Sequence, residues 1–398
     1  MNRFFSTILL ATFTMVFVAS CNSEKKENKH PNQFTVDGEI KGLTGDLYFR
    51  HPDKEYTRET PPDTLKFING KIHFSDTISK LTLIRAYPSF TGPDNKLFKI
   101  PKGGRGMFPV KCGYLMFYAF PGAKITIQGE ATDFMNAYPS GDQFNNSLAA
   151  ANKLTFPNYN KMGNLAVQNT YETDSIKMKE NDVISEEIFK KNTEDLIAHI
   201  KANPNSLGGA WYLNDMLLRR QIDDDKAEEL FTNLSKDLSE YEDYKNVASR
   251  IEGTKSTKEG FPVPSIKTTA TLDGKEFDIN SLRGKYVLID FWGIWCGPCV
   301  AEMPQVKEFQ EKHKEKLVVL GINSGDSKEK IDEFVKKHDY TWRQLMSDKA
   351  NTSDNFVNRF NVQGFPTKFI IDPRGNIVKK YLGGGEDAFK LLEELLNK

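Results

Sequence analysis

Residues 292–299 have the sequence Trp292-Gly293-Ile294-Trp295-Cys296-Gly297-Pro298-Cys299, and the pattern of apolar residues changes on either side of them. Before them, residues 286–291 form a short apolar run that is typical of a strand buried on both faces. A helical pattern follows them, and residues 317–322 then form a second apolar run. This order predicts a strand–helix–strand unit with parallel strands, in which the two cysteines follow a buried strand and open a helix.

The spacing of the two cysteines indicates thiol–disulfide chemistry. The unpaired N–H groups and the dipole at a helix start stabilise a thiolate, so we expect Cys296 to have a lowered pKa and to act as the nucleophile. Cys299 lies one turn further along the helix, close enough to form a disulfide with Cys296 and release a bound partner. Gly297 permits a close approach, and Pro298 suits the first turn of a helix, where its missing N–H costs little.

A Cys-x-x-Cys pair also occurs as one half of a zinc site. Zinc requires two further ligands at compatible spacing, and the sequence has no second cysteine pair. Its six histidines are scattered over different parts of the chain. We therefore predict no metal site and no cofactor. The isolated Cys112 is interpreted as a small buried apolar residue, with a third redox thiol as the alternative.

The N-terminus has the pattern of an export signal. A cationic start precedes an apolar run at residues 4–18, and two small residues stand directly before Cys21. This pattern resembles the lipobox of bacterial lipoproteins, which implies that residues 1–20 are a signal peptide and that Cys21 is lipidated. The alternatives are an ordinary signal peptide or a transmembrane anchor, although a spanning helix needs roughly 20 apolar residues. Residues 21–33 are polar and are expected to form a flexible tether.

The rest of the chain shows three patterns in succession. Residues 34–142 have alternating apolar positions and turn signals, and they predict an all-β domain. Residues 143–253 have helical spacing and predict a helical domain. A linker is expected at 254–260, followed by an α/β domain at 261–398.

Particular features are expected within the first two of these domains. In the all-β domain, residues 63–67 and 71–74 flank Asn69-Gly70, a dipeptide that tolerates the positive φ angles of a hairpin turn. A second hairpin is expected across residues 114–128. In the helical domain, the acidic triplet at 223–225 is interpreted as a helix N-terminus, where acids offset the helix dipole, rather than as a calcium site.

The composition excludes several classes of protein. The chain has 398 residues, of which 54 are basic and 54 acidic, so its formal net charge is 0 and no basic field would gather nucleic acid. The mean hydropathy of −0.53 excludes a polytopic membrane protein. Four cysteines are too few for a disulfide-stapled scaffold. An aromatic fraction of 12% argues against general disorder.

Residues 262–398 resemble the TlpA-like thiol:disulfide oxidoreductases, a branch of the thioredoxin fold. The resemblance rests on the dithiol motif and on the segments Asp290-Phe291-Trp292 and Ala301-Glu302-Met303-Pro304 on either side of it. Far downstream, Gly364-Phe365-Pro366-Thr367 matches the family's cis-proline loop. Val300 departs from the family, because many members have Arg or Lys after the second cysteine.

The resemblance implies roles for individual residues. Pro366 would place the backbone of Phe365 beside the sulfurs, where an extended substrate pairs as an added strand. Asp290 would relay a proton to or from Cys299, with a pKa raised by burial. The alternative for this residue is a solvated acid at the end of a strand. The other residues that we expect to contact substrate are Trp295, Gly297, Pro298 and Thr367.

The predicted function is that of a lipoprotein thiol:disulfide oxidoreductase, mainly a reductase or isomerase of protein disulfides. The lipid anchor would hold it to a membrane, facing the periplasm or the outside of the cell. Its expected partners are extracytoplasmic proteins with disulfides and a membrane electron donor, and family resemblance makes apocytochrome c one candidate substrate. No nucleic acid is expected as a partner.

Other functions are also compatible with parts of the pattern. The main rival is a ligand- or partner-binding lipoprotein that uses the thioredoxin-like domain as a scaffold or redox sensor, because a fold does not by itself define a function. A peroxidase is disfavoured, since Gly293 occupies the place where a peroxiredoxin needs Thr.

Overall fold

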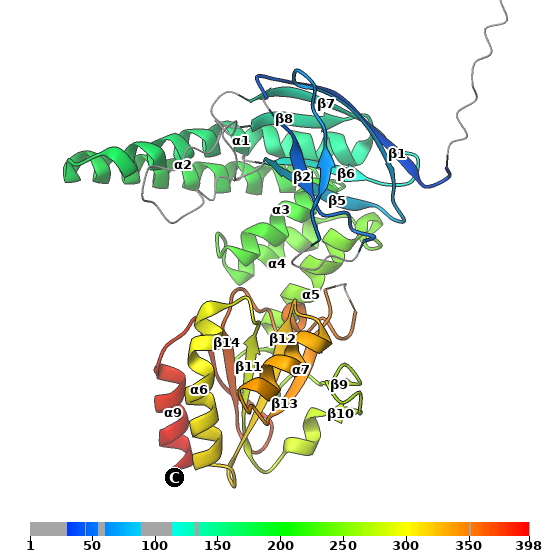
Figure 1. Ribbon diagram of the computed structural model, residues 1–398. Coiled ribbons are helices and arrows are strands. Elements are labelled where there is room, and N and C mark those ends of the chain that lie inside the picture. Colours follow the sequence, from blue (N-terminus) through cyan, green and yellow to red (C-terminus); the bar gives the residue numbers. More distant parts are fainter. Residues whose placement is uncertain are drawn as a thin grey trace, which may run out of the picture.

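The computed structural model describes residues 30–43, 45–54, 60–88, 114–131, 135–349 and 352–397. Strands, then helices, then an α/β part follow one another along the chain (Figure 1). We call them the β region (residues 33–140), the helical segment (residues 143–256) and the thioredoxin-fold domain (residues 258–396). The expected fold class is confirmed. The expected signal peptide, Cys21 and Cys112 lie outside the described residues.

The described strands of the β region form two sheets around an apolar core. One sheet has the order β4-β1-β7-β8, with β1 and β7 parallel, and the other has the order β3-β2-β5-β6. Phe34, Val36 and Ile40 of β1 are buried in this core. The strands are β1 (Gln33–Lys41), β2 (Leu47–Phe49), β3 (Asp63–Leu65), β4 (Lys71–Thr77), β5 (Thr82–Pro88), β6 (Leu115–Ala119), β7 (Lys124–Ala131) and β8 (Met135–Ser140).

The first expected hairpin is present only at its turn, and the second is wrong in its strand pairing. Ile68 and Lys71 pair across Asn69 and Gly70, whose φ angles are 51° and 76°, but β3 before the turn pairs with β2 and β4 after it pairs with β1. In the second case, β6 pairs with β5 whereas β7 pairs with β1 and β8. β6 is buried on both faces, because Phe117 belongs to the β core while Met116 and Tyr118 belong to the core of the helical segment. The chain therefore changes sheet at each turn.

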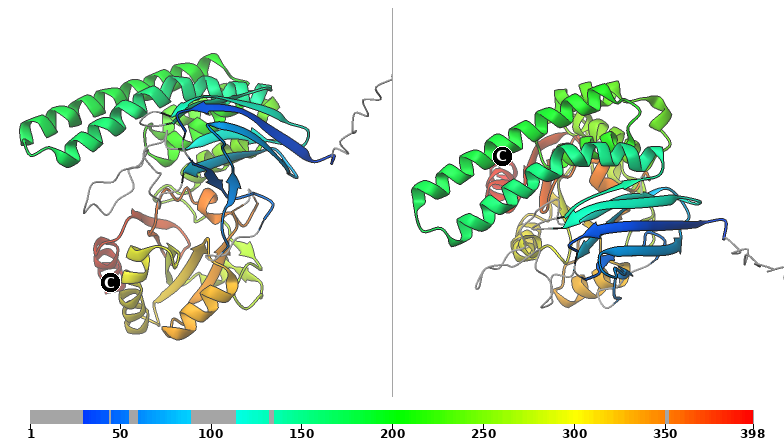
Figure 2. Two further views of the ribbon diagram at one scale, coloured as in Figure 1. Left: turned by 45° about the horizontal axis from the view of Figure 1, so that its top comes forward. Right: turned by 90° about the horizontal axis from the view of Figure 1, so that it is seen from above.

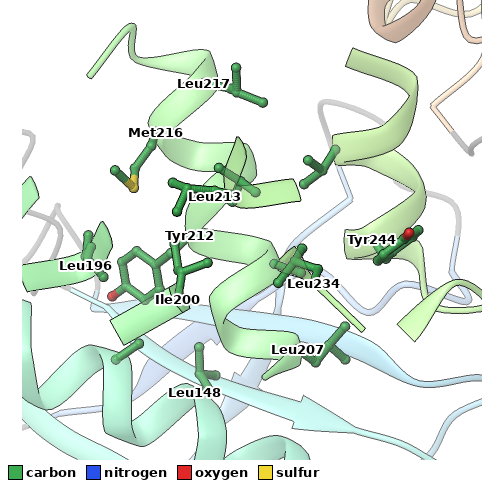
Figure 3. Packing of buried hydrophobic residues seen from close by; sticks show 14 of the residues in the cluster. Leu148, Leu196, Ile200, Leu207, Tyr212, Leu213, Met216, Leu217, Leu234 and Tyr244 are labelled. Carbon is green, nitrogen blue, oxygen red and sulfur yellow. The ribbon is translucent and has the colours of Figure 1, made fainter. Parts of the chain in front are cut away.

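The helical segment packs around a separate core that includes Leu148, Tyr212 and Leu213 (Figure 3). Asp223 accepts a hydrogen bond from the N–H of Lys226, which confirms the helix N-terminus expected at the acidic triplet. α1 and α2 form a long pair that projects from the rest of the molecule (Figure 2). The helices are α1 (Gln143–Tyr171), α2 (Ser175–Ala202), α3 (Leu207–Leu218), α4 (Asp224–Asn233), the short 3-10 helix η3 (Lys236–Leu238) and α5 (Glu242–Ser256). None of the described helices combines the length and apolar character needed to cross a bilayer.

The expected linker at residues 254–260 begins later than the sequence suggested. α5 continues through Ser256, although residues 254–256 are polar and lack apolar spacing. The helix ends where the Thr257 hydroxyl donates a hydrogen bond to the carbonyl of Gly253 at 2.5 Å. The first half of the expected linker is therefore helical.

The thioredoxin-fold domain is built on a sheet with the strand order β13-β12-β11-β14-β15. α6, α7 and α9 cover one face of this sheet, and α8 covers the other together with residues 261–282 (Figure 1). Along β11, Leu288 and Trp292 pack on the α6 side, whereas Ile289 packs on the α8 side. Because side chains alternate along a strand, Asp290 lies on the α6 side.

The elements of this domain agree closely with the sequence pattern. The two expected apolar runs are present as β11 and β12, and the helix expected between them is present as α6. The elements are β9 (Lys267–Thr268), β10 (Phe277–Asp278), the 3-10 helix η4 (Ile279–Leu282), β11 (Tyr286–Trp292), α6 (Gly297–Lys312), β12 (Leu317–Ser324), α7 (Lys328–Lys337), β13 (Arg343–Ser347), α8 (Phe356–Arg359), β14 (Thr367–Ile371), β15 (Ile377–Leu382) and α9 (Asp387–Leu396).

A partly buried hydrogen bond joins the β region to the helical segment. The Tyr118 hydroxyl on β6 donates to a carboxylate oxygen of Asp243 on α5, at 2.5 Å. Burial raises the pKa of Asp243 from its ordinary value of 3.8 to about 6. The charged form of this carboxyl group is therefore disfavoured in the folded protein.

We expect Asp243→Asn to stabilise the protein at about pH 7.5. Asparagine is neutral and still accepts the hydrogen bond from Tyr118, whereas the buried carboxylate is charged at this pH. A pKa shift of this size corresponds to about 3 kcal/mol. Since the folded pKa lies above the unfolded one, the destabilisation is absent below the unfolded pKa and fully developed above the folded pKa. Urea unfolding at about pH 7.5 and about pH 4 measures the difference.

The stabilisation by Asp243→Asn should disappear at the lower pH. The exposed Glu186→Gln variant on α2 is a control for loss of a negative charge at the surface. A stabilisation that is equal at both pH values would contradict the raised pKa of Asp243.

Candidate active site

The two cysteines of the motif form a disulfide at the start of α6. Cys296 is the N-cap residue of the helix, and its sulfur accepts a hydrogen bond from the N–H of Cys299 at 3.2 Å. Pro298 lies in the first turn, where its missing N–H removes no helical hydrogen bond. Both cysteines are buried, with 5% of Cys296 and 1% of Cys299 exposed. An otherwise unpaired N–H group of the helix start therefore points to the sulfur that was expected to be the nucleophile.

Exposed residues surround the buried disulfide. Gly297 and Pro298 are exposed, as expected of residues that contact a substrate. Trp295 is 54% exposed, and its indole N–H donates to the carbonyl of Ser324 at 2.8 Å. Trp292 is fully buried and belongs to the core. The two tryptophans of the motif therefore have different environments, and only Trp295 is available to a partner.

The cis-proline loop (residues 364–367) lies beside Trp295. The peptide bond between Phe365 and Pro366 is cis, and the Phe365 ring packs against Trp295 with ring centroids 5.1 Å apart. Thr367, the first residue of β14, is fully buried, so the expected substrate contact by its side chain is wrong. Its hydroxyl instead donates a hydrogen bond to the carbonyl of Gly364 at 2.7 Å. The antiparallel pairing of β14 with β11 places this loop next to the residues that follow β11.

A buried cluster of charged side chains lies on the α6 side of the sheet. Asp290 and Lys368 are paired across β11 and β14, and each is 2% exposed, with Oδ1 and Nζ 3.5 Å apart. Lys368 also donates a hydrogen bond to Glu302 on α6. The other carboxylate oxygen of Glu302 accepts the N–H of Gly385 at 2.6 Å. Glu302 follows Cys299 by three residues, so both side chains lie on the same face of α6.

The surroundings of Asp290 favour its protonated form. Burial is the main cause that raises its pKa above the ordinary value, the carboxylate of Glu302 raises it further, and the ammonium group of Lys368 acts in the opposite direction. In the described part of the chain, no donor makes a full hydrogen bond to Oδ1 of Asp290. Such a carboxyl group holds its proton to a higher pH than an exposed one, which suits proton exchange with a thiol.

Sequence reasoning found Asp290 but missed Lys368 and gave Glu302 no role. A signal for Lys368 was available, because a lysine that opens a run of buried strand residues is rarely buried without a charged partner. The identity of that partner depends on the packing of α6 against the sheet. The expected lipidation site, Cys21, lies outside the described residues.

Comparisons with known proteins identify the family. Residues 258–396 match the Redoxin family. The thiol-disulfide oxidoreductase ResA of a Bacillus cereus strain is 34% identical over 140 residues, which cover 35% of this chain and 77% of that protein. The chain belongs to the ResA family of thiol-disulfide oxidoreductases. ResA of Bacillus subtilis is 31% identical over 135 residues, which cover 33% of this chain and 71% of that protein.

The match to the ResA family confirms the expected TlpA-like thiol:disulfide oxidoreductase. Among solved structures, the thioredoxin domain of a thiol-disulfide oxidoreductase from Bacteroides vulgatus is 28% identical. That alignment covers 35% of this chain and 99% of the other chain, with a TM-score of 0.32. The β region and the whole helical segment lie outside the residues that match the Redoxin family.

We expect Asp290→Asn to slow the step in which Cys299 releases a bound partner, by about 10²-fold, the lower end for general acid–base catalysis. Asparagine has a similar volume but cannot accept a proton. The wild-type rate should rise with pH as the carboxylate forms, and burial moves this rise above the ordinary carboxyl range. The variant should lose this part of the profile. Stopped-flow turnover of a disulfide peptide between about pH 5 and about pH 8 measures both effects.

A matched control is Asp332→Asn on α7, because Asp332 is a partly exposed acid in an ion pair with Lys336. It removes the same charge away from the dithiol and should leave turnover unchanged. If Asp290→Asn keeps the wild-type rate and pH profile, Asp290 has only a structural role.

Proposed function

We propose that this protein is a membrane-anchored, extracytoplasmic thiol:disulfide oxidoreductase that mainly reduces or isomerises disulfides in other proteins. The observation that supports this function best is the Cys296–Cys299 disulfide at the N-terminus of α6, next to the exposed Trp295 and the cis-proline loop. The exposed residues around this pair can contact an extended polypeptide, which can pair with the backbone of Phe365 as an added strand.

The reaction begins with the reduced enzyme. The thiolate of Cys296 attacks one sulfur of a substrate disulfide, and the other substrate sulfur leaves as a thiolate and takes up a proton. Cys299 then passes its proton to Asp290 and attacks the sulfur of Cys296. The second substrate sulfur leaves and is protonated in turn. The substrate has gained a pair of electrons and a pair of protons, and the enzyme is left with the Cys296–Cys299 disulfide.

Continued reduction requires a donor that reopens this disulfide after each cycle. Outside the cytosol we propose a membrane electron donor, because cytosolic thiol reductants are absent there. The Gly-Pro dipeptide between the cysteines is shared with thioredoxin and favours a reducing enzyme. We keep apocytochrome c as one candidate substrate, since its cysteines must be reduced before haem attachment.

The second candidate function is that of a ligand- or partner-binding lipoprotein. A cavity of about 740 Å³ in the β region favours it, with a lining that includes Tyr48, Arg50, Arg85 and Tyr87. Aromatic and basic side chains of this kind suit an anionic ligand with an apolar body. In this case the thioredoxin-fold domain would serve as a scaffold or a redox sensor.

A trapping experiment separates the two candidates. We expect Cys299→Ser to leave Cys296 covalently joined to its substrates, because the attack that releases them is lost. Affinity purification of the full-length variant from its own cells should therefore recover a small set of proteins that dithiothreitol releases. Mass spectrometry identifies them and tests whether apocytochrome c is among them.

The matched control is Cys296→Ser, which lacks the attacking sulfur and should capture no protein through a disulfide. If Cys299→Ser also captures nothing under several growth conditions, the oxidoreductase proposal fails and the binding lipoprotein is favoured.

The lipid anchor is tested separately. We expect Cys21→Ser to move the protein from the membrane fraction to the soluble fraction, because acyl chains rather than the polar tether would hold it. Immunoblotting of fractionated cells measures the distribution, and Cys112→Ser is the control for loss of a cysteine. Continued sedimentation of Cys21→Ser with membranes would indicate a retained signal anchor or a membrane partner instead.

A further inference from the structure

The segment that leads into the cis-proline loop is held by the helical segment. α8 ends at Arg359, and only a few residues separate it from Phe365. Lys380 of β15 donates a hydrogen bond to the carbonyl of Asn361 at 2.8 Å, so this carbonyl is held from within the domain. The next carbonyl, that of Val362, accepts a hydrogen bond from outside the domain.

The donor to Val362 is Arg250 on α5, whose Nη1 lies 3.3 Å from the carbonyl oxygen. Arg250 is only 6% exposed, and its Nε donates to Oδ1 of Asn214 at 3.0 Å. In the part of the chain that the structure describes, Arg250 forms no ion pair with a carboxylate. A buried cation with neutral partners is unfavourable for stability unless those hydrogen bonds are made. The hydrogen bond from Arg250 therefore holds the Val362 carbonyl of the thioredoxin-fold domain in place against the helical segment.

Neighbouring contacts hold the same segment. The Gln363 side chain accepts a hydrogen bond from Nε of Arg220 at 2.8 Å and donates one to the carbonyl of Leu217 at 3.1 Å. Asn361 donates a hydrogen bond to the hydroxyl of Thr254 at 2.5 Å. Three successive residues before the loop therefore contact the helical segment.

A glycine allows the helix to approach this closely. A Cβ atom added at Gly253 of α5 would lie 2.7 Å from the carbonyl oxygens of both Asn358 and Arg359. That distance is shorter than van der Waals contact, and the atoms in the way belong to the backbone. α5 therefore packs directly against the end of α8, one turn from Arg250.

We propose that Arg250 is a positioning residue for the substrate-binding loop, and that the helical segment through it sets the position of Phe365 and Pro366. The inference rests on the proposed function, in which a substrate pairs with the backbone of Phe365. Strand addition needs a backbone that is already in place, because ordering a loop upon binding reduces affinity. Arg250 touches no reacting atom, so its effect should be on substrate binding rather than on the thiol chemistry.

The experiment compares two substrates with the purified protein. In the insulin assay, dithiothreitol re-reduces the dithiol after each turnover, whereas the reaction with Ellman's reagent uses protein that has been reduced and then freed of dithiothreitol. Insulin must pair with the loop, whereas Ellman's reagent is a small disulfide that reacts with an accessible thiolate alone. For Arg250→Met we expect the KM for insulin to rise about tenfold, as for loss of a hydrogen bond from a charged donor, with kcat changed less than about twofold. The reaction with Ellman's reagent should keep its wild-type rate. Amide hydrogen exchange at residues 362–365 should become faster.

Neighbouring arginines supply a second variant and a control. Arg220→Met removes an exposed side chain that contacts Gln363, so it should fold and raise the KM for insulin in the same direction by a smaller factor. Arg219→Met is the control, because Arg219 pairs with Asp215 inside the helical segment. It should leave the KM unchanged. If Arg250→Met does not fold, Arg220→Met and Arg250→Lys carry the test, and both should raise the KM.

The outcomes separate this inference from the proposed function. If the wild-type protein fails to reduce insulin, the proposed function is contradicted. If the wild type reduces insulin and both Arg220→Met and a folded Arg250 variant keep its KM, the positioning role is wrong. An equal loss of rate with insulin and with Ellman's reagent would also overturn it, because the dithiol itself would then be disturbed.

Discussion

The antiparallel pairing of β11 with β14 is the interaction on which the active site depends. Its register sets Phe291 opposite Thr367 and Asp290 opposite Lys368. The first pair brings the cis-proline loop, which ends at Thr367, to the chain that leads into the dithiol. The second pair places a carboxyl group and an ammonium group together on the α6 side of the sheet. A slip of one residue would turn Lys368 to the other face and leave Asp290 without a partner.

Burial of the charged cluster costs free energy that apolar side chains in the same place would not. Ion pairs as deeply buried as Asp290 and Lys368 lose most of their hydration, and apolar residues of similar volume are often equally stable in their place. When Asp290 is protonated, Glu302 supplies the negative charge that balances the buried ammonium group of Lys368. Glu302 stands one turn from Cys299. The thiol–disulfide exchange thus has groups nearby that can donate and accept protons, in a place that bulk water reaches poorly.

The thioredoxin-fold domain was predictable from the sequence because its signals are local. The central strands β11 and β12 are nearly continuous apolar runs, and the helix start at Cys296 follows from residues within a few positions of it. The pairing in the β region was not predictable, since alternation along β6 shows that side chains are buried but not that two different cores bury them. Lys368 and Arg250 were missed for a related reason. Their partners, Glu302 and Val362, are far away in the sequence, and only the packed fold brings them into contact.

The double burial of β6 has a consequence for how the molecule unfolds. Phe117 and Tyr118 are adjacent in the chain but belong to different apolar cores. Loss of either core would expose one whole face of this strand to water. The β region and the helical segment should therefore unfold as one cooperative unit. A destabilising substitution in either part then lowers the stability of both. If the chain were cut at the boundary between them, each fragment would expose the apolar surface that the other part covers. Exposed apolar surfaces of this kind lead to aggregation.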